Sequence, residues 1–113
     1  MTLYDLTIHA AIDLMQRGEL TSVELTQSVL DRIVAVENQI QAYLTLAPEQ
    51  ALEQARHADA RRARGETAPL LGVPLAIKDI LCVEGLPCTC GGWRRHTPPH
   101  RSTAGLQAFT RPC

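Results

Sequence analysis

The sequence contains few aromatic residues and no long hydrophobic run. Only four of its 113 residues are aromatic, so a core must be built from alanine, leucine, isoleucine and valine. No apolar run approaches the roughly 20 residues that cross a bilayer, and the N-terminus lacks the basic flank and apolar stretch of a secretory leader. The composition, 45% hydrophobic and 20% charged, is typical of a folded chain. We therefore expect a cytoplasmic protein without membrane contact.

Acidic residues are missing from the C-terminal end of the chain. Residues 1–92 contain all 12 aspartates and glutamates together with seven basic residues, whereas residues 93–113 contain four arginines and no acid. The C-terminal end also lacks valine and isoleucine, so it cannot form a periodic apolar face. We predict that residues 1–92 belong to a folded domain and that residues 93–113 form an irregular tail.

Two segments near the N-terminus have apolar residues at helical spacing. The first helix is predicted to follow Thr7, a residue type that caps helices, and to stop at Gly18, where a left-handed backbone is needed. The second is predicted to begin at a capping box formed by Thr21 and Glu24 and to fade near Asn38. Both helices should bury their apolar side against neighbouring elements.

A third helix is predicted from about residue 49 to residue 64, with Pro48 in its first turn. Its small residues should lie close against a neighbour: Ala51, Ala55, Ala58 and Ala63. Its basic residues gather toward its end: Arg56, Arg61, Arg62 and Arg64. Such a run can bind nucleic acid, but interspersed acidic residues favour a solvated surface that compensates the helix dipole. We therefore predict that these arginines form a solvated surface rather than a nucleic-acid-binding site.

Two segments are predicted to be strands. Residues 42–46 form a short apolar stretch that ends before a proline. Residues 70–77 are a nearly continuous apolar run, which suits a strand buried on both faces of a sheet. Helices of this length around buried strands indicate an α/β fold.

Lys78 follows the second predicted strand and is the chain's only lysine, against ten arginines. An arginine keeps its proton at physiological pH, whereas the pKa of a desolvated lysine can fall toward neutrality. A neutral amine could serve as general base for a nucleophile. From position alone, the simpler interpretation is a lysine at a strand end, paired with an acid.

The cysteines and histidines offer a weak metal-binding alternative. Cys88 and Cys90, with His96 and His100, could supply four ligands. Cys-x-Cys lacks the two-residue spacing of a zinc knuckle, however, and small buried cysteines of a loop are the simpler interpretation. We predict no metal site. The remaining histidines are expected on helix surfaces: His9 and His57.

A longer motif surrounds the lysine. Gly72-Val73-Pro74 precedes three apolar residues and Lys78-Asp79, and Thr89-Cys90-Gly91 follows. This pattern resembles the start of the amidase signature family, and the resemblance covers about residues 3–92. It implies an α/β fold in which helices pack on a mixed sheet, with only the N-terminal part of that fold in this chain.

The resemblance also implies a reaction. The lysine that matches Lys78 is the base of a Ser–cis-Ser–Lys triad and takes a proton, through the bridging serine, from the serine that attacks the amide. The helices are most similar to those of the glutamine-hydrolysing subunits of tRNA amidotransferases. That similarity implies B and C partner subunits, glutamine as substrate, and mischarged tRNA bound through the B subunit. ATP and Mg²⁺ would be bound by the B subunit, and this chain would hold no cofactor.

The sequence departs from the family pattern in its serines. None lies in a Gly/Ser-rich context: Ser22, Ser28 and Ser102. We therefore expect an N-terminal fragment that is inactive alone, with the reading frame broken near residue 92. Two alternatives stay open, namely a piece of a stand-alone amidase for another amide and a non-enzymatic helical module that binds a partner.

Overall fold

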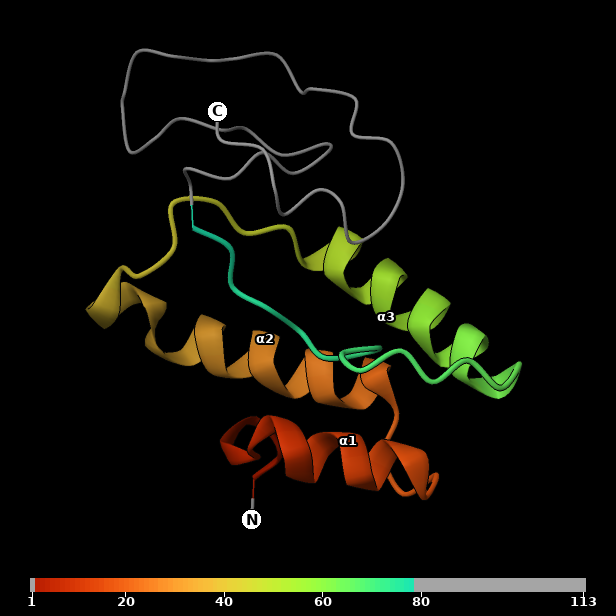
Figure 1. Ribbon diagram of the computed structural model, residues 1–113. Coiled ribbons are helices and arrows are strands. Elements are labelled where there is room, and N and C mark those ends of the chain that lie inside the picture. The colour runs from red at the N-terminus through yellow and green to blue at the C-terminus, as the bar shows by residue number, and fades with distance from the viewer. Residues whose placement is uncertain (1, 79–113) are drawn as a thin grey trace. The chain divides into compact units, whose positions relative to one another are not determined.

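The structure, a computed structural model, describes residues 2–78 (Figure 1). This part contains a short 3-10 helix, η1 (Leu3–Asp5), and the α-helices α1 (Ile8–Gln16), α2 (Ser22–Ile40) and α3 (Pro48–Ala63). It falls into two units, residues 2–41 with 47–75 and residues 42–46 with 76–78, and all the helices belong to the first. No helix in this range is long and apolar enough to cross a bilayer.

Helix α1 begins and ends as predicted. The Thr7 side chain accepts a hydrogen bond from the Ala10 N–H at 3.2 Å, which satisfies one of the helix's free N–H groups. Gly18 follows the last turn with φ of 72° and donates its N–H to the Met15 carbonyl at 3.2 Å. The glycine therefore ends the helix in the left-handed conformation that other residues adopt only with strain.

Helix α2 begins at the predicted capping box. The Thr21 N–H donates to a Glu24 carboxylate oxygen at 2.8 Å, and the Glu24 N–H donates to the Thr21 hydroxyl at 3.1 Å. Two hydrogen bonds from Thr21 lower the pKa of the Glu24 carboxyl below its ordinary value. The bond from the Thr21 N–H has the larger effect, and the bond from the Thr21 hydroxyl has the smaller one. The helix continues past Asn38 to Ile40 and ends where Gln41 adopts φ of 51°.

Helix α3 packs against α2, and α2 lies between α1 and α3 in Figure 1. Pro48 is its first residue, as predicted, because a proline costs no hydrogen bond in the first turn. Ala55 and Ala58 are buried, which confirms the middle of the predicted alanine face. Ala63, at the last turn, is exposed, so the close contact does not extend to the end of the helix.

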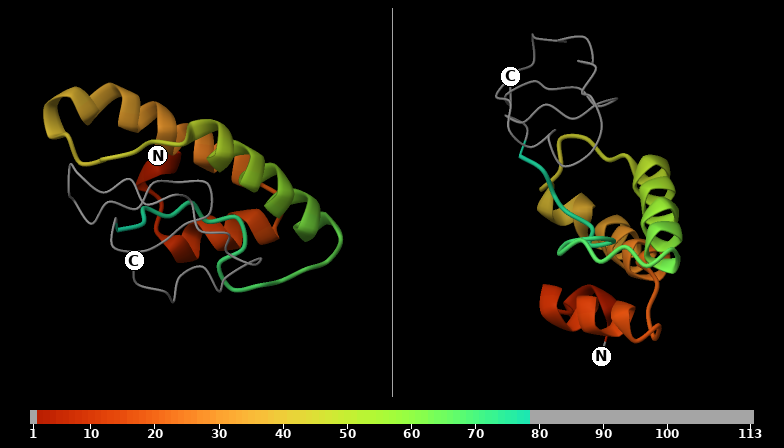
Figure 2. Two further views of the ribbon diagram at one scale, coloured as in Figure 1. Left: turned by 90° about the horizontal axis from the view of Figure 1, so that it is seen from above. Right: turned by 45° about the vertical axis from the view of Figure 1, so that its right-hand side comes forward.

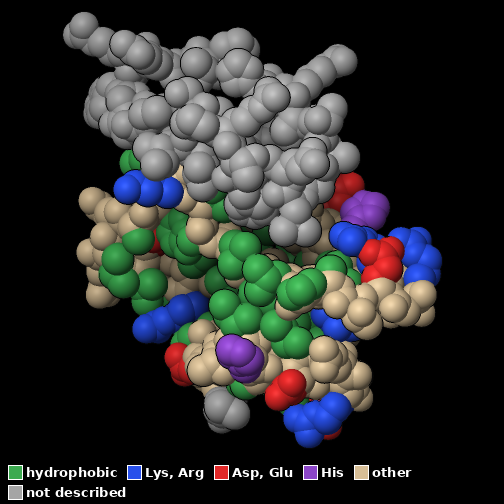
Figure 3. All heavy atoms as spheres, viewed as in Figure 1, with side chains coloured by type: hydrophobic (Ala, Val, Ile, Leu, Met, Phe, Trp, Pro, Cys, Tyr) green, Lys and Arg blue, Asp and Glu red, His purple; other side chains and the backbone are tan. Residues whose placement is uncertain are grey.

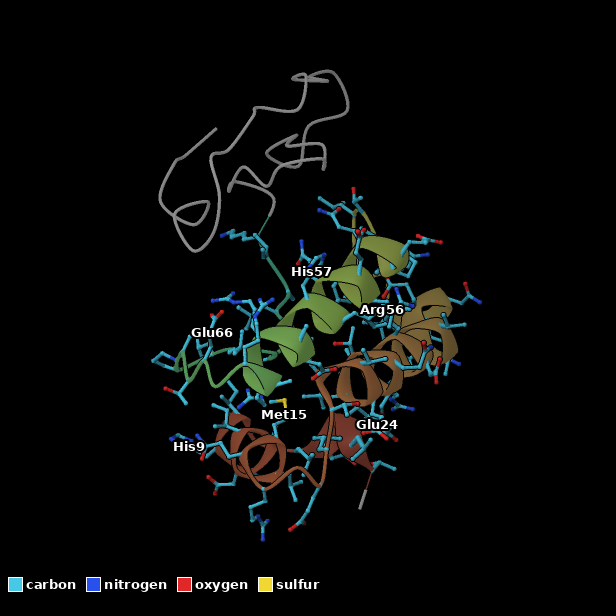
Figure 4. The ribbon with its side chains drawn as sticks, turned by 90° about the vertical axis from the view of Figure 1, so that its right-hand side faces the viewer. His9, Met15, Glu24, Arg56, His57 and Glu66 are labelled. Carbon is cyan, nitrogen blue, oxygen red and sulfur yellow. The ribbon has the colours of Figure 1, made fainter. Side chains whose placement is uncertain are left out.

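The core of the first unit is aliphatic and small. Four side chains form its buried cluster, from α1, the turn after it and α2: Ala11, Met15, Leu20 and Leu25. Figure 4 shows Met15 pointing from α1 toward the other helices. Other apolar side chains reach the surface of the described part, as Figure 3 shows on one face. Ile8, the apolar first residue of α1, is 46% exposed.

The predicted strands are wrong for the described part of the chain. Residues 42–46 and 70–77 contain no strand, and no strand occurs anywhere in residues 2–78. A strand needs a neighbour for its backbone N–H and C=O groups, and the described residues provide none. Leu44 and Leu75, which a sheet would cover, are 73% and 50% exposed. The α/β class and its mixed sheet are therefore not seen in this part of the amidase-like chain, which is helical.

Candidate functional site

Lys78 is the last residue that the structure describes. It lies in an irregular segment, and its side chain is exposed, as are the side chains of residues 75–77 before it. The expected buried strand end is therefore absent here, and residues 2–78 do not by themselves provide the desolvation that would favour a neutral amine. Asp79 lies outside the described residues.

The backbone that leads toward Lys78 makes a close approach at Gly72. This residue has φ of 85°, and a Cβ added to it would lie 3.0 Å from the Ser22 Cβ and 3.3 Å from the Met15 sulfur. Either feature alone disfavours a side chain. The glycine of the motif is thus required by backbone conformation and by packing.

Two side chains from different helices hold the carbonyls at this point. The Ser22 hydroxyl donates to the Gly72 carbonyl at 2.7 Å, and Ser22 is only 2% exposed. An Arg62 guanidinium nitrogen donates to the neighbouring Leu71 carbonyl at 2.6 Å. Figure 2 shows the segment after α3 turning back toward the start of α2, where these contacts form. Two successive peptide groups are therefore fixed.

Asp59 of α3 completes the same arrangement. Its carboxylate accepts the Ser22 N–H at 2.7 Å and the Val23 N–H at 3.1 Å. With Thr21 bonded to the Glu24 N–H, the first three N–H groups of α2 all have partners. We call the set formed by Ser22, Asp59, Arg62 and Gly72 the α2 junction. It joins α2, α3 and the segment after α3, and it lies wholly in the first unit.

The α2 junction was not predicted from the sequence. The sequence pattern places Ser22 only in a helix, and it places Asp59 only among the acids interspersed with the arginines of α3. The motif glycine was the available indication, because a glycine inside an apolar, strand-like run often marks a close approach. Its partner Ser22 lies 50 residues away in sequence, so nothing local identifies it.

The arginine-rich end of α3 is engaged within the chain. Arg61 forms an ion pair with Glu66 at 2.7 Å, Arg64 lies 3.9 Å from the same carboxylate, and Arg62 bonds to the Leu71 carbonyl. The ion pairs with Glu66 agree with the predicted charge-compensated surface, whereas Arg62 is partly buried and bonds to a loop carbonyl instead of facing solvent. His9 and His57 are exposed on α1 and α3, as predicted, and Figure 4 shows both on the outside.

The candidate metal ligands Cys88, Cys90, His96 and His100 lie outside the described residues, as do the whole tail and Ser102. Within residues 2–78 no group of histidine, cysteine, aspartate and glutamate side chains is arranged to hold a metal ion.

Comparison with known proteins gives consistent matches. The amidase family model matches residues 24–104. The glutamyl-tRNA(Gln) amidotransferase A subunit of Moorella thermoacetica is 51% identical over 109 residues, which cover 91% of this chain. Proteins of the same name from Geobacter sp. strain M21 and Roseiflexus sp. strain RS-1 are each 48% identical, over 92% and 90% of the chain.

The matches differ in how much of each protein they cover. The chain spans 22% of the Moorella and Geobacter relatives and 21% of the Roseiflexus one. The family match runs past residue 92 to residue 104, so it includes part of the acid-free end. The boundary at residue 92 and the broken reading frame stay predictions.

Proposed function

The chain belongs to the amidase family, and from that premise we propose that it is the N-terminal part of a glutamine-hydrolysing subunit of a tRNA amidotransferase. The complete subunit would release ammonia from glutamine, and the ammonia would convert Glu-tRNA(Gln) to Gln-tRNA(Gln). The observation that carries this proposal is the 51% identity, over nine-tenths of the chain, to a protein named as that subunit.

In this proposal Lys78 is the base. Its neutral amine takes the proton of the attacking serine through a bridging serine, an acyl-enzyme forms, and ammonia leaves before water releases glutamate. A lysine acts as a base only in its neutral form, which burial away from water favours. Because Lys78 is exposed in the described structure, the proposal requires further protein to cover it.

We propose that the nucleophile comes from elsewhere in the family's fold, because none of the chain's serines lies in the Gly/Ser-rich context that the resemblance requires. Ser22 is buried, and its hydroxyl is bonded to the Gly72 carbonyl. Ser28 lies within α2, and Ser102 lies outside the described residues. The proposed site therefore depends on serines from the remainder of the family's fold, including its mixed sheet, and we expect the chain to be inactive alone.

The proposal brings partners with it. B and C subunits would complete the assembly, and the B subunit would bind the mischarged tRNA and use ATP and Mg²⁺, so this chain would hold no cofactor. The assembly would act in the cytoplasm, without membrane contact. The proposal is favoured over a piece of an amidase for another amide, because the relatives described above are tRNA amidotransferase subunits by name.

A chimeric subunit tests the proposal directly. Residues 1–92 of this chain would replace the matching segment of the Moorella relative, whose own remainder would supply the serines. We expect the chimera to release ammonia from glutamine. Lys78→Ala should lower the rate about 10²- to 10⁴-fold, the range for loss of a general base. Arg56→Ala, at an exposed α3 position, is the matched control and should leave the rate unchanged.

Three outcomes separate the alternatives. A chimera that hydrolyses glutamine only while Lys78 is present supports the proposal. A chimera that prefers other amides over glutamine indicates a stand-alone amidase. Binding of a partner would indicate the helical binding module instead, if that binding is unchanged by Lys78→Ala and weakened by substitution of Val29 or Ile33 in α2.

A further inference from the structure

The α2 junction fixes the point from which the chain continues toward Lys78. The Gly72 carbonyl is bonded to Ser22, and the preceding Leu71 carbonyl is bonded to Arg62. Leu71 is buried at 7% exposure, and Val73 packs against the core cluster. The side chains of residues 75–78 are exposed. Anchoring of this segment to the first unit therefore ends near residue 73.

The distance along the chain from this anchor to Lys78 is short. Gly72 and Lys78 are six residues apart, which limits their separation to about 20 Å even in a fully extended chain. Pro74 lies between them and fixes its own φ, while restricting the residue before it. The anchor at Gly72 and the proline at position 74 therefore limit the conformations of the segment that leads to Lys78.

Two side chains of the α2 junction, those of Ser22 and Arg62, bond to loop carbonyls rather than to helix ends. The N–H groups at the start of α2 are already satisfied by Asp59 and by Thr21. The Ser22 hydroxyl is thus not needed as a helix cap, and it bonds instead to the Gly72 carbonyl. Arg62 similarly bonds to a loop carbonyl, whereas its neighbour Arg61 pairs with Glu66.

We propose that Ser22 and Arg62 are positioning residues for the amidase reaction: by holding the Gly72 and Leu71 carbonyls they fix the start of the segment that delivers Lys78. This inference rests on the proposed function of Lys78. Proton transfer is sensitive to placement, and a misplacement of about 1 Å can cost on the order of 10²-fold in rate.

Hydrogen exchange in the 113-residue chain tests the anchoring without any activity. The Leu71 N–H donates to the Ala68 carbonyl at 3.1 Å, and the Val73 N–H donates to the Leu70 carbonyl at 3.2 Å. Ser22→Ala should speed exchange of both amides about tenfold, because the loop then opens locally. Thr21→Ala is the matched control: it removes a cap from the same helix end without touching residues 71–73.

Steady-state kinetics of the chimeric subunit tests the effect on catalysis. Ser22→Ala and Arg62→Ala should each lower kcat for glutamine about tenfold and leave KM within about twofold, because they displace the base rather than the substrate contacts. Thr21→Ala should change neither constant. Arg62→Ala serves as the second variant, since it leaves the start of α2 intact if Ser22→Ala fails to fold.

The outcomes distinguish the inference from the proposed function. Faster exchange at Leu71 and Val73 together with a selective loss of kcat supports the inference. An active chimera in which kcat is unchanged by Ser22→Ala and Arg62→Ala overturns it while leaving the proposed function standing. Unchanged exchange of the Leu71 and Val73 amides in Ser22→Ala of the 113-residue chain also overturns the inference. An unsubstituted chimera that is inactive contradicts the proposed function, and with it the positioning role.

Discussion

The two ends of α2 differ sharply although the helix has apolar residues along its whole length. At its start, Ser22, Leu25 and Thr26 are buried, and its first N–H groups are bonded. At its end, Val34 and Ile40 are 74% and 62% exposed. The start is held by α1, α3 and the segment after α3, whereas Val34 and Ile40 near the end are mostly uncovered. An apolar stripe thus predicts a helix but does not say which part is packed.

The largest expected change in the free energy of unfolding is at a packed position of α2, which is compared with an exposed position of the same helix. Leu25→Ala should destabilise the chain by about 2–5 kcal/mol, because it leaves a cavity in the core cluster. Val34→Ala, at the exposed end, should change the free energy of unfolding by less than about 0.5 kcal/mol. Urea unfolding followed by helicity compares the two. Equal effects would contradict the difference between the two ends.

A pair of glycines sharpens the comparison. Gly72 and Gly18 both have positive φ, but only at Gly72 does an added Cβ meet other atoms, the nearest at 3.0 Å. Gly72→Ala should therefore cost about 2–4 kcal/mol, from strain and overpacking. Gly18→Ala should cost about 1–2 kcal/mol, from strain alone. Thermal unfolding measures both, and a larger loss for Gly18→Ala would refute the close approach at Ser22.

The smallest expected effect depends on pH. The pKa of Glu24 is lowered in the folded chain by hydrogen bonds from Thr21. A group with a lowered folded-state pKa stabilises the fold above its unfolded pKa, about 4.3 for glutamate, and loses that contribution as the pH falls through the folded value. Glu24→Gln should thus be less stable than the parent at pH 7, and the difference should close in acid. A difference constant from pH 7 to pH 3 would contradict the ionised capping box.

The helices were predictable because their determinants are local. Thr7, Gly18, Thr21, Glu24 and Pro48 all act within about one turn of the chain, and each acts in the structure as the sequence indicated. Helix ends depend on such nearby groups. The end of α2 lies two residues beyond the predicted one, which is the usual uncertainty of a helix end without a glycine.

The strands and the surroundings of Lys78 were not predictable in the same way. A strand is stabilised by neighbours that are distant in sequence, and residues 42–46 and 70–77 have no such neighbours among residues 2–78. The α2 junction was missed for a related reason, since its hydrogen bonds join residues up to 50 positions apart. The motif around Lys78 located the candidate base, but the environment of an amine is a property of the assembled fold.

The central claim, that Lys78 acts as a base and not as a fixed positive charge, is tested most directly by Lys78→Arg in the chimeric subunit. Arginine keeps the charge but does not give up its proton. We predict that ammonia release from glutamine is lost in Lys78→Arg as completely as in Lys78→Ala. Ammonia release at the parent rate in Lys78→Arg would contradict the role of Lys78 as a base.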